Sequence, residues 1–172
     1  MSSANHAREV TDVAAALAVD PNRGLAAGEA VRRRIHFGPN VIHLGGGWRS
    51  WSDLALHFLR SSPPAIAYVL SDGEEMVVRA ADLVPGDVII VESGITVPAD
   101  ARILTATGLI VDERDLTGSS FSVTKSPSPV CETEPLPERR SMLYLGTQVV
   151  EGHGTAIVTA IGDATELAKI RK

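Results

Sequence analysis

Only one cysteine, Cys131, occurs in the 172-residue sequence, so the chain cannot form an internal disulfide bond. A secretory leader is lacking too, because no charged segment followed by an apolar stretch and small residues opens the sequence. Both absences make the cytoplasm the expected compartment of this chain. As a lone cysteine in a polar loop, Cys131 is expected to be an incidental free thiol rather than a nucleophile.

Long hydrophobic runs are missing as well. No segment approaches the roughly 20 apolar residues that a membrane helix requires. The nearest candidate, residues 51–70, is interrupted by Asp53, His57, Arg60 and the pair Pro63-Pro64. We therefore expect the chain as written to be soluble.

Aromatic residues make up only 4% of the sequence, and basic residues are outnumbered by acidic ones. The net charge of −5 and the pI near 5.5 argue against a nucleic-acid-binding surface, which normally has a basic face. The only basic run is Arg32-Arg33-Arg34. It is typical of a solvated helix face, although next to a membrane it could also meet anionic lipid headgroups.

The motifs of metal and nucleotide sites are absent from the sequence. The five histidines, at positions 6, 36, 43, 57 and 153, show no short metal-ligand spacing, and no cysteine pair joins them. There is no Gly-x-x-x-x-Gly-Lys-Ser/Thr loop and no Gly-x-Gly-x-x-Gly fingerprint. We expect neither a metal site nor a nucleotide-binding site in this chain.

What is present suits one folded domain with an appendage, since 44% of the residues are hydrophobic and 22% are charged. Val10, Val13, Ala14 and Leu17 form one apolar helical stripe, which Asp20-Pro21-Asn22 terminates. A second helix is predicted over residues 26–37, with Gly38 as a left-handed residue beyond its end and Pro39 preventing continuation. Packing of this helix pair on the rest of the chain is a more economical interpretation than a ligand site.

Residues 41–64 are predicted to form a linker rich in Gly, Ser and Pro. An amphipathic patch lies inside it, made of Trp48, Trp51, Leu54, Phe58 and Leu59. Contact with a membrane surface and burial on the folded domain are the two interpretations of this patch.

From residue 65 onward the pattern changes to short β-rich runs separated by turn residues, which predicts a small β domain. The expected strands cover residues 66–70, 76–78, 88–91, 101–106, 109–112, 142–150 and 155–161. Asp72-Gly73 predicts a tight hairpin, and Gly152-His153-Gly154 predicts the turn between the last two strands. Residues 126–140, with four prolines, should form an exposed loop. A closing helix is expected from Asp163, capped by that residue with Glu166 reaching back.

Four motifs follow one another between residues 85 and 125. They are Pro85-Gly86-Asp87, Val97-Pro98-Ala99-Asp100, Asp112-Glu113-Arg114-Asp115-Leu116-Thr117-Gly118-Ser119-Ser120 and Phe121-Ser122-Val123-Thr124-Lys125. The first is interpreted as a tight turn in which Asp87 bonds backbone amides, and Asp100 of the second as the cap of a loop. In the third, glycine lets the backbone approach a phosphate closely and point an N–H at it. An ordinary polar turn is the alternative, because Thr-Gly-Ser-Ser alone is a weak motif.

In order and spacing these motifs resemble the actuator domain of P-type cation-transporting ATPases. The family loop reads Asp-Glu-Ser-x-Leu-Thr-Gly-Glu-Ser followed by x-Pro-Val-x-Lys. This chain matches it at Asp112, Glu113, Leu116, Thr117, Gly118, Ser120, Val123 and Lys125. It departs at Ser119 and Ser122. Residues 24–40 resemble the cytoplasmic N-terminal region of pumps for calcium, sodium or protons, and residues 145–147 and 159–170 resemble the end of the actuator domain.

The resemblance implies a mainly β fold, a distorted jelly-roll barrel flanked by an N-terminal helix pair. It divides the chain into a helical region (1–40), a linker in place of the first two membrane helices (41–64) and the actuator β domain (65–172). In the implied pump cycle the loop, here Thr117, Gly118, Ser119 and Ser120, covers an aspartyl phosphate of a separate domain. The family's loop glutamate activates the attacking water, and Ser119 stands in its place.

Because serine has no useful basicity near pH 7, we expect impaired dephosphorylation, by roughly 10²- to 10⁴-fold. The resemblance assigns Asp112, Glu113 and Lys125 to loop support, and replacement of the missing base by Glu113 or Asp115 is not expected. It places Pro85, Gly86, Asp87, Pro98 and Asp100 in structural motifs away from the phosphate.

The implied partners are the phosphorylation and nucleotide-binding domains of a P-type ATPase. ATP and magnesium belong to the full-length family, and no cofactor is expected in this chain. The parent protein would place the domain on the cytoplasmic face of the cell membrane. Three hypotheses stand: an actuator fragment of a pump, natural or engineered; a free-standing, catalytically silent actuator-like binding protein or gene remnant; and an unrelated small β-barrel binding module.

Overall fold

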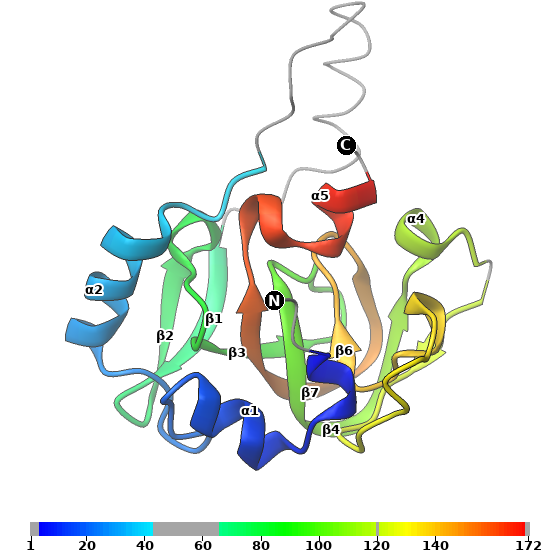
Figure 1. Cartoon of the computed structure of the whole chain (residues 1–172), viewed down its shortest axis with the longest axis horizontal. Coiled ribbons are helices and arrows are strands. Elements are labelled where there is room, and N and C mark those ends of the chain that lie inside the picture. The colour runs from blue at the N-terminus through cyan, green and yellow to red at the C-terminus, as the bar shows by residue number, and fades with distance from the viewer. Residues whose placement is uncertain (1–3, 43–65, 120, 171–172) are drawn as a thin grey trace, which may run out of the picture.

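The computed structural model describes residues 4–42, 66–119 and 121–170, and shows a curled antiparallel sheet with helices around it (Figure 1). The helical elements in chain order are η1 (Asn5–Ala7), α1 (Val10–Ala16), α2 (Ala27–Phe37), η2 (Ala80–Asp82), α4 (Arg114–Thr117), η3 (Leu136–Glu138), η4 (Gly162–Ala164) and α5 (Glu166–Ile170). The strands are β1 (Ile66–Ser71), β2 (Glu74–Arg79), β3 (Val88–Glu92), β4 (Asp100–Asp112), β5 (Val123–Thr124), β6 (Met142–Leu143) and β7 (Gln148–Ala160). The predicted mainly β fold with flanking helices is confirmed, and it agrees with a distorted jelly roll.

Within the described residues, seven strands form one sheet in the order β2-β1-β3-β7-β4-β5, and β6 pairs with β4. All of these pairs are antiparallel. The predicted hairpin between β1 and β2 is confirmed, because Asp72 (φ 53°) and Gly73 (φ 90°) both adopt the positive φ of a primed turn. The predicted amphipathic patch of the linker lies outside the described residues.

The two longest strands, β4 and β7, differ from their prediction. Each is a continuous strand of 13 residues, so the predicted turn at Gly152-His153-Gly154 is wrong, and so is the predicted gap between residues 106 and 109. Register shifts interrupt the pairing of the two strands near Gly108. There the backbones approach so closely that a Cβ on Gly152 (φ 78°) would lie 2.2 Å from the oxygen of Gly108. The glycines therefore allow a shared bend of two paired strands.

The predicted strand over residues 142–150 is also divided. Only Met142 and Leu143 form β6, and β7 begins at Gln148. Between them the chain turns at Gly146 (φ 85°), where the N–H of Thr147 donates to the oxygen of Tyr144 at 3.2 Å. This turn brings Tyr144 and Leu145 into the core under the helices.

Two groups of buried side chains matter for the position of the loop. The large core inside the curled sheet contains Ala67, Val69, Leu83, Ile89, Val91, Val97, Ala99, Ala101, Ile103, Leu109, Val111, Leu143, Val149, Ala156, Val158 and Ile161. A second cluster, which joins α4 to α5, consists of Leu116, Met142, Tyr144, Leu145 and Leu167. The helical turn of the motif loop is thus anchored by Leu116.

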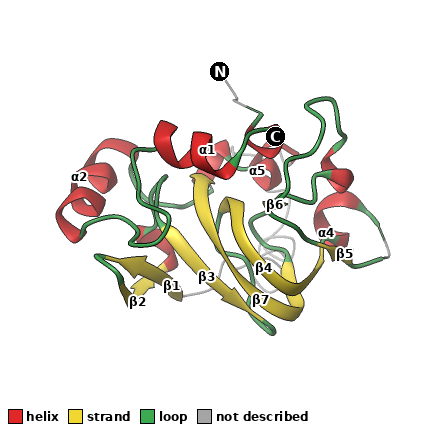
Figure 2. Ribbon diagram, turned by 90° about the horizontal axis from the view of Figure 1, so that it is seen from below, coloured by secondary structure: helices red, strands yellow, loops and turns green. Residues whose placement is uncertain are grey.

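Both N-terminal helices dock on the β domain, but by different means. Ala14 of α1 packs against Val88 and Ile157, with Leu17 beside them, so the predicted apolar stripe of α1 is confirmed. Figure 2 shows α1 and α5 on the same side of the sheet. Because Val88 lies under α1 while Ile89 lies in the main core, β3 is covered on both faces.

Helix α2 attaches through arginines instead of apolar side chains. Arg33 donates to the oxygen of Pro85 at 2.8 Å, and Arg34 donates to the oxygen of Asp82 at 3.1 Å. The interpretation of the basic run as a solvated face is therefore wrong for Arg33, whose side chain is 14% exposed, whereas the side chain of Arg34 is 39% exposed. Val31 and Ile35 of α2 are 53% and 82% exposed. Gly38 follows the helix with φ 75° and ψ −171°, so its positive φ is confirmed, although it lies outside the left-handed helical region.

The closing helix begins later than predicted. Residues Gly162–Ala164 form a 3-10 turn, and α5 starts at Glu166, so the predicted start at Asp163 is wrong. The hydroxyl of Thr165 accepts from the N–H of Ala168 at 3.3 Å, and the carboxylate of Asp100 accepts from the N–H of Glu166 at 2.7 Å. A carboxylate of β4 thus helps to set where this helix begins.

Candidate functional site

The motif loop leaves the end of β4 through a single helical turn, α4. The backbone oxygen of Glu113 accepts from the N–H groups of Leu116 and Thr117, at 3.0 and 2.9 Å, and from the hydroxyl of Thr117 at 3.0 Å. Gly118 ends the turn in the left-handed region, with φ 72° and ψ 0°. A glycine suits this position because other residues pay a steric cost there.

Beyond the turn, hydroxyl groups hold the loop backbone. The Thr117 hydroxyl accepts from the N–H of Ser119 at 3.2 Å, and the Ser119 hydroxyl accepts from the N–H of Phe121 at 3.3 Å. Gly118 is exposed, Ser119 is half-buried, and Phe121 is 82% exposed. The predicted site residue Ser120 lies outside the described residues. Helix α4, from which the loop starts, lies at the end of the molecule opposite α2 (Figure 1). The loop thus exposes the backbone of Gly118 and the side chain of Phe121.

Directly below the loop, Glu113 and Lys125 form a buried ion pair. Nζ of Lys125 lies 2.5 Å from Oε1 of Glu113, and neither side chain has any exposed surface. Apart from this contact, the described residues offer no hydrogen bond to the Glu113 carboxylate or to Nζ of Lys125. Burial raises the pKa of Glu113 and lowers the pKa of Lys125, and the attraction between the two charges opposes both shifts.

The ion pair closes the base of the loop because Glu113 and Lys125 directly follow two paired strands, β4 and β5. Val111 of β4 pairs with Val123 of β5, and the N–H of Lys125 donates to the oxygen of Leu109 at 2.8 Å. Nζ of Lys125 also lies 5.6 Å from the centre of the Tyr144 ring, a cation–π contact. Burial raises the pKa of Tyr144. These contacts hold together the two segments between which the loop runs, the end of β4 and the end of β5.

The other acidic residues of the motif face outward. Asp112 accepts from the N–H of Arg114 at 3.0 Å, and its second carboxylate oxygen lies 3.4 Å from the Arg114 guanidinium. Asp115 is exposed on α4. Of the three carboxylates next to the loop, only that of Glu113 points into the interior, where Lys125 holds it.

The turn Pro85-Gly86-Asp87 is the docking point of α2. Asp87 accepts from the N–H of Val84 at 2.8 Å, and burial raises the pKa of Asp87 to about 6. Gly86 has φ 101°, and a Cβ there would lie 2.1 Å from the guanidinium of Arg33. This turn is bound to α2, whereas α4, from which the motif loop starts, lies at the opposite end of the molecule (Figure 1).

The second motif ties three segments together in the interior. The carboxylate of Asp100 accepts from the N–H of Leu145 at 2.9 Å as well as from that of Glu166. Burial raises the pKa of Asp100 to about 7. The oxygen of Pro98 accepts from the side-chain amide of Asn40 at 2.8 Å. The structure thus places Pro98 and Asp100 in contacts that join the barrel to the N-terminal and C-terminal segments.

Three buried polar residues of structural importance were missed by sequence reasoning. Asn40 also donates to the oxygen of Ala80 and accepts from the N–H of Gly162. Tyr144 lies under Lys125, and Arg102 is fully buried. The signal for Arg102 was its position in an otherwise apolar run, Ala101 to Leu104, where a charged side chain requires compensation.

Two further observations concern metal binding and membrane spans. In the ranges 4–42, 66–119 and 121–170, no three His, Cys, Asp or Glu side chains come together in a way that could hold a metal ion. Over the same ranges, no helix has the length and apolar character needed to cross a membrane.

Comparison with known proteins identifies two matching sequence families. The P-type ATPase actuator domain matches residues 61–172, and the N-terminus of cation transporters and ATPases matches residues 5–62. Probable cation-transporting ATPase F of Mycobacterium bovis is 31% identical over 222 residues, which cover 99% of this chain and 24% of that protein. Calcium-transporting ATPase 1 of Schizosaccharomyces pombe is 38% identical over 130 residues, 76% of this chain and 14% of that protein.

A third relative, cation-transporting ATPase pma1 of a Synechocystis strain, is 43% identical over 104 residues, 60% of this chain and 12% of that protein. The chain spans about a quarter or less of the length of these curated relatives. The alignment with the mycobacterial protein covers 222 positions, whereas the chain has 172 residues, so at least 50 aligned positions lack a counterpart here. The two family matches exclude the hypothesis of an unrelated β-barrel. Because the actuator family matches well over half of the sequence and the fold agrees with it, the chain belongs to the P-type ATPase actuator domain family.

Proposed function

We propose that this chain is the actuator portion of a cation-transporting P-type ATPase, and that its dephosphorylation loop has kept its shape but lost its general base. In the proposed reaction, a water oxygen attacks the phosphorus of an aspartyl phosphate on a partner domain. The bond between phosphorus and the aspartyl oxygen breaks, which returns the aspartate carboxylate and releases phosphate. The proton of the attacking water needs an acceptor, and a carboxylate suits that task near pH 7.

The observation that carries the proposal is the contrast between Ser119 and Glu113. The contacts that shape the helical turn are made by backbone atoms, by the Thr117 hydroxyl and by the buried Leu116, and none of them involves the Ser119 side chain. Gly118 is exposed and has no Cβ, so the backbone can approach a phosphate there. The side chain at the proposed base position is a hydroxyl, whose basicity is too low. The nearest alternative, the Glu113 carboxylate, is buried and paired with Lys125. Loss of the base corresponds to roughly 10²- to 10⁴-fold in rate.

The proposed partners are the phosphorylation and nucleotide-binding domains of the pump. Support comes from the exposed surface at the loop, where Phe121 has 82% of its surface free for contact. We place ATP and magnesium in those domains, as the family resemblance implies. The parent protein would hold the domain at the cytoplasmic face of the membrane, with the transported ion chosen by segments outside this chain.

The test replaces Ser119 in a complete pump that carries this actuator. Ser119→Glu should accelerate phosphoenzyme breakdown by about 10² or more, followed as loss of acid-stable phosphate from prelabelled enzyme. Ser119→Gln is the matched control, because it has the size of glutamate without its basicity and should leave the rate unchanged. An equal rate in the serine and glutamate forms would refute the idea of a disabled catalytic position.

A second candidate function is a stand-alone, catalytically silent actuator-like protein that binds another pump. The 50 or more alignment positions without a counterpart favour it, since they fit the loss of a membrane segment pair. Binding of the isolated chain to a purified phosphorylation domain would support this function if Phe121→Ser weakens it. No association at high micromolar concentration would count against it.

A further inference from the structure

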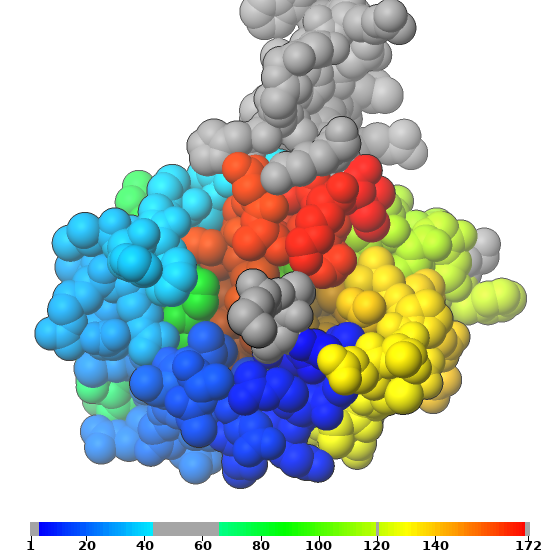
Figure 3. All heavy atoms as spheres, in the orientation of Figure 1, coloured from blue at the N-terminus to red at the C-terminus, as the bar shows by residue number. Residues whose placement is uncertain are grey.

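The N-terminal residues Asn5–Arg8, which we call the strap, lie between the β domain and the loop of residues 126–140. On the face shown in Figure 3 the N-terminal segment (blue) lies directly against this loop (yellow). The strap contains one 3-10 turn, η1, and precedes α1. Its contacts with the rest of the chain are made mainly by backbone carbonyl groups.

Arg102 of β4 is the centre of the surface that receives the strap. Its guanidinium is fully buried and donates to five backbone oxygens, which uses a donor set that arginine presents in a fixed planar fork. The oxygens are those of Asn5 (3.0 Å), Arg8 (2.9 Å), Pro127 (2.8 Å), Ile103 (2.8 Å) and Ser141 (3.3 Å). Among the described residues no carboxylate forms an ion pair with Arg102, so backbone carbonyl groups are its direct partners, and the more distant charge of Glu9 also attracts it.

His6 is bound next to Arg102, and it is the only deeply buried residue of the strap, at 6% exposure. Its backbone oxygen accepts from the N–H of Val130 at 3.0 Å and from the hydroxyl of Ser141 at 2.8 Å. Its ring nitrogen Nε2 lies 3.1 Å from the oxygen of Glu132. Three of the four strap residues, Asn5, His6 and Arg8, are therefore held by hydrogen bonds to the β domain or the loop of residues 126–140.

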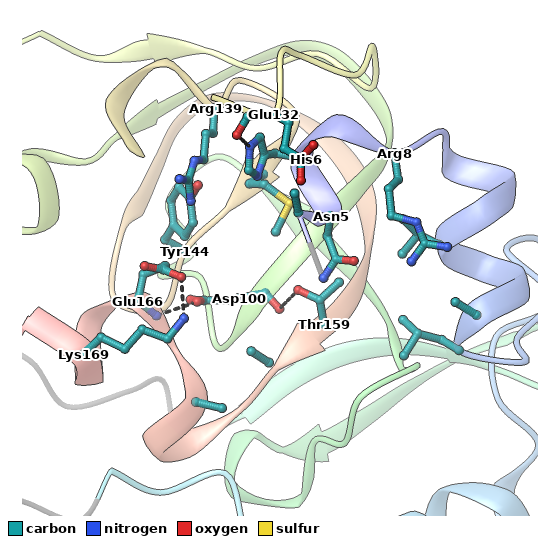
Figure 4. A pocket seen from close by; sticks show the side chains of 17 residues that line it. Asn5, His6, Arg8, Asp100, Glu132, Arg139, Tyr144, Thr159, Glu166 and Lys169 are labelled. Atoms are coloured by element: carbon teal, nitrogen blue, oxygen red, sulfur yellow. Dashed lines mark hydrogen bonds and ion pairs between the residues drawn. The ribbon is translucent and has the colours of Figure 1, made fainter. Parts of the chain in front are cut away.

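The receiving surface is built to persist without the strap. Three of the five oxygens around Arg102, those of Ile103, Ser141 and Pro127, lie outside the strap. The guanidinium therefore keeps three of its five hydrogen bonds when the strap leaves. The strap contributes no residue to the three hydrophobic clusters of the described residues, and Asn5, His6 and Arg8 border a cavity of about 610 Å³ (Figure 4). A segment with few apolar contacts beside a cavity has low local stability.

We infer that Arg102, Ser141 and the backbone of residues 127–132 form a peptide-binding socket, whose ligand is the chain's own strap, bound reversibly while the β domain stays folded. The socket recognises peptide carbonyl groups and one histidine ring. Opening of the strap exposes Arg102 to the cavity and frees α1 from its fixed N-terminal end. This inference does not depend on the proposed function.

The first test measures strap release in the full chain by limited trypsin digestion, with cleavage after Arg8 followed by mass spectrometry. Arg102→Met should speed cleavage of the Arg8–Glu9 bond at least about tenfold, because even one lost hydrogen bond from a charged donor changes an equilibrium by roughly that factor. Ser141→Ala, which removes only the bond to His6, should speed it less. Arg79→Met is the matched control, since Arg79 is exposed and bonds only Asp82.

Unchanged cleavage after Arg8 in both socket variants would overturn the inference. It would also be overturned if all tryptic sites accelerate together with a lower thermal midpoint, because the strap would then open only with the whole domain. Ser141→Ala keeps the test valid if Arg102→Met fails to fold.

The second test asks whether the socket binds the strap as a separate peptide. Chain cleaved after Arg8 is mixed with a fluorescent peptide of residues 1–8, and exchange is followed by anisotropy. We expect the anisotropy to rise to saturation with the peptide of natural sequence. A peptide with His6→Ala should bind more weakly. A cleaved chain that neither retains nor exchanges its peptide would contradict a socket.

Discussion

The buried ion pair between Glu113 and Lys125 allows us to predict how a substitution changes the free energy of unfolding. Lys125→Met keeps most of the volume of the side chain but removes its charge, which leaves the Glu113 carboxylate buried with no hydrogen bond from the described residues. Removal of one partner from a buried pair costs about 3–5 kcal/mol in the free energy of unfolding. The loss should appear as a lower urea midpoint at an unchanged m-value.

A matched control is available within the chain. Lys169 and Glu166 form an ion pair of nearly the same length, 2.6 Å, but with 46% and 26% of their side-chain surfaces exposed. Lys169→Met should therefore cost less than about 1 kcal/mol. The double variant Glu113→Leu/Lys125→Met should recover most of the loss of the single variant, since no buried charge remains.

The pH dependence gives a second readout of the same variant. Without Lys125, burial and, to a lesser extent, the charge of Asp112 raise the folded-state pKa of Glu113 above the unfolded value. A raised carboxyl pKa contributes stability that is present below the unfolded pKa and is lost as the pH rises through the folded pKa. The penalty of Lys125→Met should therefore be smaller at pH 5 than at pH 8. A penalty under 1 kcal/mol at pH 8, or a double variant as unstable as the single one, would refute this reasoning.

Two further predictions concern a glycine and a buried acid. Gly152→Ala should cost more than about 3 kcal/mol because its Cβ would meet the oxygen of Gly108 at 2.2 Å, whereas Gly94→Ala, with φ 91° in open space, should cost only the backbone strain of about 1 kcal/mol. Equal urea midpoints for the two variants would contradict the bend. Burial raises the pKa of Asp100 from 3.8 to about 7, so the folded state favours the protonated carboxyl group. By that shift, protonated Asp100 contributes roughly 4 kcal/mol to the free energy of unfolding. The contribution is complete below pH 4 and is lost as the pH rises through 7. Asp100→Asn should flatten the fall of the urea midpoint between pH 4 and 8, and parallel curves for both proteins would exclude this assignment.

Local signals predicted those parts of the structure that depend on neighbouring residues. The hairpin at Asp72-Gly73 and the end of α2 at Gly38 were found because a positive φ is a local requirement. Gly152 carries the same requirement, but its cause is a backbone 44 positions earlier, at Gly108, and no local pattern separates such a bend from a turn. The late start of α5 has the same origin, because Asp100 of β4 binds its first N–H.

The site shows the same division between near and distant contacts. The order Thr117-Gly118-Ser119 predicted a tight loop, and its capping bonds span only two to four residues. Tyr144, which lies against Lys125, comes from a different strand connection and had no signal in the spacing of the motif. Arg102 likewise meets partners 94 and 97 positions away. Polar groups in the interior are determined by which segments the fold brings together.

This division agrees with the proposed loss of a catalytic side chain from a loop that keeps its form. The turn is built on the backbone oxygen of Glu113, and the base of the loop is closed by the side chain of the same residue. The Ser119 side chain contributes one bond, to the N–H of Phe121, at the far side of the turn. Glutamate at this position would give up that bond, worth roughly 1 kcal/mol, while the contacts of Glu113, Thr117 and Lys125 remain. Reversal of the substitution therefore requires no rearrangement of the loop, which is why Ser119→Glu tests chemistry rather than folding.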